Sequence, residues 1–110
     1  MKAVTISVDD GICRIELNRP EAMNTFNTEL ALQLDSALRE AEADGGVRVV
    51  VVSGAGKHFS TGIDLRELSS KERHEIPAFL ELMDLHNYRL ASMTKPVIAS
   101  VHGYALANGT

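Results

Sequence analysis

The segment Val47–Leu65, VRVVVVSGAGKHFSTGIDL, contains the residues that decide the fold. Its first part, Val47–Val52, is an almost continuous run of valines, and β-branched residues at this density favour a strand. Since only Arg48 interrupts the run, we expect a strand covered on both faces, as in a parallel or mixed sheet with helices outside. The second part, His58–Leu65, is predicted to be a loop that leads from the strand into a helix.

Segments on either side of this stretch alternate between strand and helix patterns. Residues 3–8 and 12–17 are β-prone runs separated by Asp9-Asp10-Gly11, and an Asp-Gly pair in this setting is a strong hairpin signal. The other predicted elements are a helix from about Thr25 to Asp44, a short helix over 64–70 capped by Asp64, a helix from about Ile76 or Pro77 to Met93, and a strand opened by Lys95–Pro96. This order predicts an α/β fold with no second domain.

The two longer helices each have one apolar face. Apolar or aromatic residues recur at helical spacing in both: Leu30, Leu34, Leu38 and Ala41 in the first, Phe79, Met83, His86 and Leu90 in the second. Candidate N-caps of the first helix are Asn24, Thr25, Asn27 and Thr28, and Gly45–Gly46 is a plausible end. These faces predict helices packed on the sheet.

Composition and charge exclude several classes of function. Hydrophobic residues make up 45% of the 110 residues and the net charge is −4, which gives no electrostatic reason to bind nucleic acid or anionic membranes. No apolar run approaches the roughly 18 residues that a membrane span needs. The N-terminus alternates like a strand and lacks the uninterrupted apolar core of a signal peptide, so no targeting segment is expected. The single Cys13 is expected to be a buried, inert thiol in a reducing compartment.

Three common catalytic patterns are absent or incomplete. Gly56–Lys57 follows a strand, but the phosphate-loop pattern needs Gly and Ser or Thr where Val51 and His58 stand. No Gly-x-Ser-x-Gly motif marks a nucleophilic serine. The chain has four histidines, His58, His74, His86 and His102. They are scattered without metal-ligand spacing, so no metal site is expected.

The loop Phe59–Leu65 is the stronger chemical candidate. It leaves a buried strand, contains Gly62 and enters a helix at Asp64, where backbone N–H groups are unpaired and lie at the positive end of the helix dipole. Such groups can stabilise a developing oxyanion. The turn Ala107–Gly109 can supply a second amide of this kind. Both segments can equally be ordinary strand-to-helix connections, and the residues alone leave these alternatives open.

The order and spacing of several motifs together resemble the crotonase family, the enoyl-CoA hydratase/isomerase superfamily. The similarity extends along essentially the whole chain. The motifs are LNRP (17–20), MNTF (23–26), VRVVVVSG (47–54), KHFSTGIDL (57–65) and KPVIASVHGYAL (95–106). The resemblance implies a fold of repeated ββα units with a mixed or parallel sheet and flanking helices. It also implies that residues 1–110 are the N-terminal part of an acyl-CoA-binding domain.

The resemblance also implies a site. The family binds acyl-CoA thioesters and holds an enolate-like oxyanion with two backbone amides, which correspond here to Ile63 and Asn108. The residues expected to contact CoA are Phe59, Thr61, Gly62, Asp64, Leu65 and Arg66, and a solvated surface role for Arg66 is an equal alternative. Asn108 stands where the family usually has a glycine. Among residues other than glycine, Asn best tolerates a positive φ. No residue present matches a family acid or base, because the hydratase glutamate falls just after the position of Thr110.

The implied activity is that of an enoyl-CoA hydratase or isomerase of fatty-acid metabolism. The resemblance implies no cofactor, because CoA is part of the substrate. The resemblance further implies a homotrimer or hexamer, located in the cytoplasm or, in a eukaryote, the mitochondrial matrix. The alternative is a catalytically inactive or truncated member that serves as an acyl-CoA-binding or assembly module. The type of reaction stays open.

Overall fold

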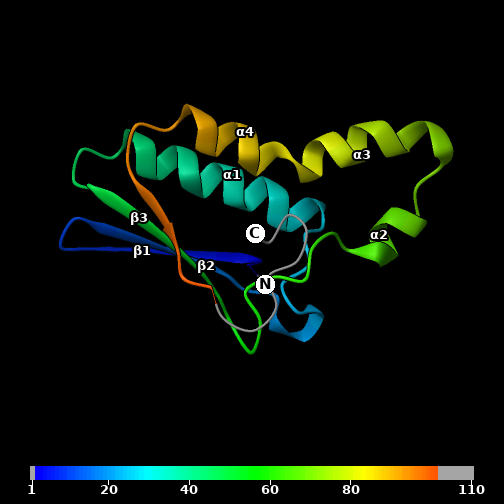
Figure 1. The fold of residues 1–110 in the computed structure, drawn as a ribbon, viewed down its shortest axis with the longest axis horizontal. Coiled ribbons are helices and arrows are strands. Elements are labelled where there is room, and N and C mark those ends of the chain that lie inside the picture. The colour runs from blue at the N-terminus through cyan, green and yellow to red at the C-terminus, as the bar shows by residue number, and fades with distance from the viewer. Residues whose placement is uncertain (1, 102–110) are drawn as a thin grey trace.

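The computed structural model describes residues 2–101, which form a four-stranded sheet with helices on one side (Figure 1). The elements in chain order are β1 (Val4–Asp9), β2 (Ile12–Leu17), the 3₁₀ turn η1 (Pro20–Ala22), α1 (Thr28–Ala43), β3 (Val49–Gly54), α2 (Leu65–Ser69), the 3₁₀ turn η2 (Arg73–Glu75), α3 (Ile76–Met83), α4 (Leu85–Ser92) and β4 (Val97–Ala99). Asn108 and His102 lie outside the described residues.

The sheet is mixed, as predicted. Its strand order is β1-β2-β3-β4, with β1 antiparallel to β2 and the pairs β2–β3 and β3–β4 parallel. Asp10 and Gly11 form the two-residue turn between β1 and β2 with φ of 53° and 79°, so the predicted hairpin is confirmed. The parallel crossovers run through α1 and through α3–α4, which therefore lie against the same face of the sheet (Figure 1).

The core lies between this face and α1. All four predicted apolar residues of α1 are buried, and they pack with the inward residues of the strands. Those strand residues are Cys13, Ile15, Leu17, Val50 and Val52. Cys13 has no exposed area, and burial raises the pKa of its thiol, which keeps it protonated.

Helix α1 begins three residues later than predicted. The side chain of Asn27 caps it by accepting a hydrogen bond from Leu30 N–H (2.9 Å). Phe26 cannot be helical because its backbone forms a parallel β-bridge with Ile63. A contact distant in sequence therefore sets the start of the helix.

The prediction that the central strand is covered on both faces is wrong for the described part of the chain. Along β3 the residues alternate between half-buried and buried, with Val49 and Val51 on the less covered face. Ile98, which pairs with Val51 on that face, is 55% exposed. The reason is topological, because α1, α3 and α4 all pack on the opposite face.

The prediction of one helix from Ile76 to Met93 is also wrong, because Asp84 divides it into α3 and α4. Asp84 has φ of −95° and ψ of 1°, and its side chain accepts a hydrogen bond from the Asn87 side chain. Its N–H donates to the C=O groups of both Leu80 (3.2 Å) and Glu81 (3.1 Å), and Asn87 N–H donates to Asp84 C=O (3.0 Å), so bonds of the 3₁₀ type enter the helix here. Three members of the predicted inward face, Phe79, Met83 and His86, are buried across the break, whereas the fourth, Leu90, is 37% exposed.

Polar contacts fix the beginning of β4, a strand of three residues. Lys95 Nζ donates to the C=O groups of Ala41 (2.7 Å) and Asp44 (2.6 Å) at the end of α1. The Glu42 carboxylate accepts hydrogen bonds from Thr94 Oγ1 (2.6 Å) and from the Thr94 and Lys95 N–H groups. These bonds lower the pKa of Glu42. The end of α1 thereby anchors the strand.

Candidate active site

The loop after β3 is held by one buried side chain, that of Asn24. Its Nδ2 donates to the C=O groups of Ala55 and His58 (both 2.8 Å), and its Oδ1 accepts from Arg19 N–H (2.7 Å). Its own C=O accepts a hydrogen bond from Ser60 Oγ (2.8 Å). Asn24 has φ of 54° and no exposed area. It therefore fixes the loop by two side-chain hydrogen bonds and one main-chain hydrogen bond, and its third side-chain bond fixes its own segment at Arg19.

The bridge between Phe26 and Ile63 orients the peptide groups of the loop. Phe26 N–H donates to Gly62 C=O (2.7 Å), and Phe26 C=O accepts from Asp64 N–H (2.9 Å). In a parallel bridge of this form the N–H of the middle residue, Ile63, faces the other way. Within residues 2–101 that N–H donates no hydrogen bond. Gly62, with φ of 101°, permits this arrangement.

The predicted anion site at the start of α2 is not formed in the expected way. Asp64 Oδ1 accepts from the N–H groups of Arg66 (2.9 Å) and Glu67 (3.2 Å), so these helix-entrance amides are already paired. Asp64 also forms an ion pair with Arg19 (3.1 Å). Burial acts most strongly on this carboxyl and raises its pKa, but the hydrogen bonds and the guanidinium outweigh it, so the pKa is lowered. The N–H groups of Arg66 and Glu67 are thus excluded as donors to a ligand, and the Ile63 N–H stays a candidate.

The other predicted site residues divide between the interior and the surface. Phe59 and Gly62 are buried, whereas Thr61 is half-buried and donates its N–H to Met23 C=O (3.2 Å). Leu65 is 72% exposed, and Arg66 lies beside it on the exposed surface of α2. The loop therefore has an inner part at Phe59–Ile63 and an outer part at α2.

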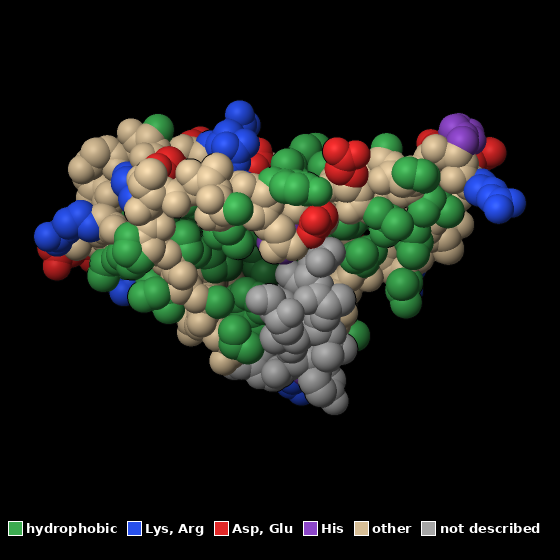
Figure 2. Space-filling view, turned by 45° about the horizontal axis from the view of Figure 1, so that its top comes forward, with side chains coloured by type: hydrophobic (Ala, Val, Ile, Leu, Met, Phe, Trp, Pro, Cys, Tyr) green, Lys and Arg blue, Asp and Glu red, His purple; other side chains and the backbone are tan. Residues whose placement is uncertain are grey.

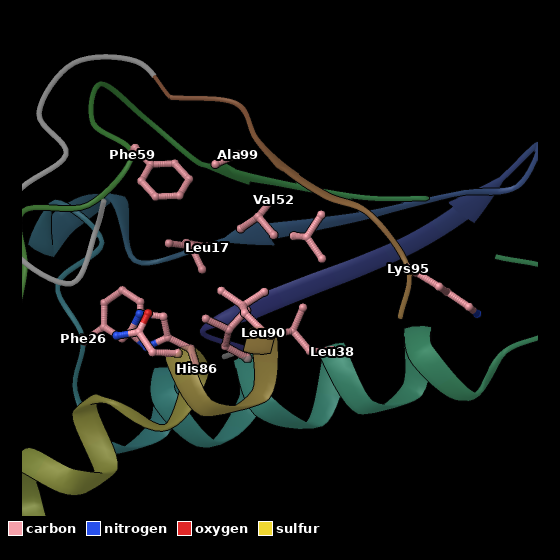
Figure 3. A pocket seen from close by; sticks show the side chains of 12 residues that line it. Leu17, Phe26, Leu38, Val52, Phe59, His86, Leu90, Lys95 and Ala99 are labelled. Carbon is pink, nitrogen blue, oxygen red and sulfur yellow. The ribbon is translucent and has the colours of Figure 1, made fainter. Parts of the chain in front are cut away.

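An apolar cavity of about 350 Å³ lies between the sheet and helices α1 and α4. Phe59 and Phe26 form its wall at the loop end, together with His86, and Lys95 lies at the opposite end (Figure 3). The His86 ring is tilted against that of Phe26, with centroids 4.8 Å apart. Hydrophobic side chains also gather on the surface beneath α3 and α4 (Figure 2). The cavity thus borders the loop that contains Ile63.

Sequence reasoning missed the positioning residues Asn24 and Phe26. Both belong to the MNTF motif, and Asn24 is also a candidate N-cap, but neither signal reveals partners more than 30 residues away. It also gave no role to Ser60, whose Oγ accepts from Gly62 N–H (3.2 Å) and has no exposed area.

Among residues 2–101, no helix is both long and apolar enough to cross a bilayer. The same part of the chain contains no group of three or more His, Cys, Asp or Glu side chains arranged to hold a metal ion.

Known proteins resemble this chain in sequence and in structure. The 1,2-epoxyphenylacetyl-CoA isomerase of Escherichia coli is 34% identical over 99% of the chain, and the 2,3-dehydroadipyl-CoA hydratase of the same organism is also 34% identical over 99%. An enoyl-CoA hydratase/isomerase from Xanthobacter autotrophicus superposes with a TM-score of 0.89, at 34% identity over 98% of the chain. The chain covers only 41–43% of the length of these proteins.

The family model of the enoyl-CoA hydratase/isomerase proteins matches residues 7–110. The match includes the loop that exposes Ile63 N–H and the Asn24 and Phe26 contacts that hold it. It agrees with the fold, since the solved structures that superpose on this sheet and its helices are crotonase-type proteins. The chain therefore belongs to the enoyl-CoA hydratase/isomerase (crotonase) family.

Proposed function

We propose that this chain supplies the oxyanion-binding part of an acyl-CoA enzyme that stabilises a thioester enolate. The observation that carries the proposal is the Ile63 N–H, which has no acceptor within residues 2–101 although both neighbouring peptides are fixed to Phe26. A donor held rigidly before the reaction is what stabilisation of a developing oxyanion requires. The amide of Asn108 is proposed as the second donor.

The proposed contacts with CoA differ between the inner part of the loop, Phe59–Ile63, and its outer part at α2. Thr61 N–H is already bonded to Met23, so the adenine would meet the Thr61 carbonyl oxygen instead. Leu65 and Arg66 are exposed on α2, which suits contact with the pantetheine arm and the phosphates of a ligand lying across the surface. Phe59 and Gly62 would line the inner end of the channel. Asp64 would contribute by fixing the loop, because its carboxylate is engaged by Arg19 and the α2 amides.

The reaction is proposed only as enolate chemistry on a CoA thioester. The two relatives of equal identity are named for an isomerase and a hydratase, so similarity does not choose between these reactions. The predictions of a trimer or hexamer, of a role in fatty-acid metabolism, of no cofactor and of a cytoplasmic location remain predictions.

The proposal is tested with Ile63→Pro, which removes the proposed donor without removing a hydrogen bond that the described fold uses. Ile63→Ala is the matched control, because it shortens the side chain and keeps the N–H. A dienoyl-CoA thioester is the probe, since polarisation of its carbonyl shifts its absorption to longer wavelength whether or not turnover follows. We expect the shift with the original chain and with Ile63→Ala, but not with Ile63→Pro.

Turnover of short enoyl-CoA substrates is measured in parallel. Loss of one oxyanion donor is expected to lower kcat by about 10²–10³-fold. A red shift without turnover would favour the alternative, an acyl-CoA-binding module without catalysis. A red shift and a turnover that survive in Ile63→Pro would contradict the assignment of Ile63.

A further inference from the structure

Among the described residues, the outer edge of β1 is the longest strand edge that has no neighbouring strand. Strand β1 has six residues, whereas β4 at the opposite edge has three. From Thr5 to Asp9 every residue of β1 is exposed, including Ile6 (40%) and Val8 (50%). Natural proteins protect such edges with Pro, Lys or a bulge, and β1 has none of these within its six residues.

The register of the hairpin shows which backbone groups lie on that edge. Asn18 N–H donates to Ala3 C=O (2.7 Å), so Ala3 bonds toward β2. Bonded and non-bonded pairs alternate along an antiparallel ladder. Val4, Ile6 and Val8 therefore direct their N–H and C=O groups outward. The Gln33 side chain confirms this at one end, where its Oε1 accepts Val4 N–H (3.0 Å).

Lys2 and Asp10 lie near the two ends of this edge and have opposite charges, so the edge is complementary in charge to the same edge read backwards. We propose that β1 pairs antiparallel with β1 of a second copy, with Ile6 opposite Ile6. In that register Val4 of one copy lies opposite Val8 of the other, and Lys2 lies opposite Asp10. The two Ile6 residues bond reciprocally, and each Val8 N–H donates to Val4 C=O of the second copy. A two-fold axis allows one surface to complete itself in this way.

The surroundings of β1 favour this occupant. Cavities of about 300 and 200 Å³ lie between β1 and α1, with Val4, Ile6 and Val8 among their apolar walls. The one near Val8 is flanked by Glu40 and Asp44. In the paired register Lys2 of the second copy lies at this acidic end. Pairing therefore brings opposite charges together and covers exposed Ile6 and Val8.

A register-specific cross-link tests the proposal on the full chain, with Cys13→Ala as background so that only the introduced thiol reacts. Ile6→Cys places two thiols opposite each other at a Cα separation of about 5.5 Å, which a disulfide spans. Val8→Cys is the control, because its counterpart lies four residues along the strand, about 13 Å away. We expect oxidation to give a covalent dimer from Ile6→Cys and little or none from Val8→Cys.

Sedimentation equilibrium provides the second measurement. Ile6→Pro removes an N–H that the monomer does not use, and Pro is tolerated on an edge strand, so the variant should fold but lose the association. Ile6→Val keeps the N–H and should keep the association. A chain that stays monomeric at its highest soluble concentration would overturn the proposal. So would equal cross-linking of both cysteine variants, or an assembly that Ile6→Pro leaves unchanged. None of these readouts depends on acyl-CoA binding.

Discussion

At the scale of single residues, Asn24 holds the loop of the candidate site through contacts that its place in the sequence does not reveal. The sequence suggests it only as one of four possible caps of α1. Its actual partners are the carbonyls of Ala55 and His58, 31 and 34 positions away, and the hydroxyl of Ser60, 36 positions away. Local spacing cannot reveal such partners. The residue instead acts as a buried link between the segment before α1 and the loop after β3.

Replacing Asn24 by alanine should destabilise the fold by about 3 kcal/mol or more, because buried carbonyl and N–H groups lose their partners. Asn24→Gly is the matched control for backbone strain, since glycine accepts the φ of 54° without cost. Urea denaturation of both variants gives the two free energies of unfolding. A loss below about 1 kcal/mol in Asn24→Gly would show that the side-chain bonds contribute little.

At the scale of elements, helix α2 has a start that neighbouring residues determine and an attachment that distant residues determine. Its start and its Asp64 cap are predicted correctly, because the cap bonds to residues two and three positions later. Its attachment is not predicted. Arg19 pairs with Asp64 across 45 positions, and Glu67 accepts hydrogen bonds from the Thr28 N–H and hydroxyl (both 2.6 Å) at the start of α1.

The lowered pKa of Asp64 predicts an acid-sensitive attachment of α2. A carboxyl whose pKa is lower in the folded state stabilises the fold above its unfolded pKa, near 3.8, and loses this contribution as pH falls through the folded value. We expect Asp64→Asn to be less stable at pH 7 by about 1–2 kcal/mol. The difference should shrink below pH 4.

The measurement is urea denaturation of both chains from pH 7 to pH 3. A difference that stays constant over this range would mean that the charge of Asp64 does not contribute. Glu42→Gln serves as a comparison, because the pKa of Glu42 is also lowered, although by bonds to Thr94 and Lys95 at another place in the fold.

At the scale of the whole molecule, the arrangement of layers determines which residues form the core. Strand β3 begins with four consecutive valines, which have the same side chain and similar neighbours in sequence. Even so, Val50 has no exposed area, whereas Val51 is half-buried. The composition of the strand suggests that both faces are covered. Only the crossovers, which place α1, α3 and α4 on one face, decide that the two sets of side chains have different surroundings.

This difference predicts unequal costs for the same substitution at adjacent positions. Val50→Thr puts a hydroxyl into the core and should cost about 1–3 kcal/mol, whereas Val51→Thr should cost about 0.5 kcal/mol. Thermal and urea unfolding of the two variants measure these costs, and each variant is the control for the other. Equal losses would indicate that the far face of the sheet is covered as well.

The sequence by itself determined the elements that depend on neighbouring residues. These are the hairpin at Asp10–Gly11, the apolar face of α1, the Asp64 cap and the mixed α/β architecture, together with a family resemblance that the comparisons confirm. Tertiary structure decided the start of α1, the single covered face of the sheet and the orientation of Ile63. The latter features depend on which distant segments pack or bond together, and short-range periodicity contains no information about those contacts.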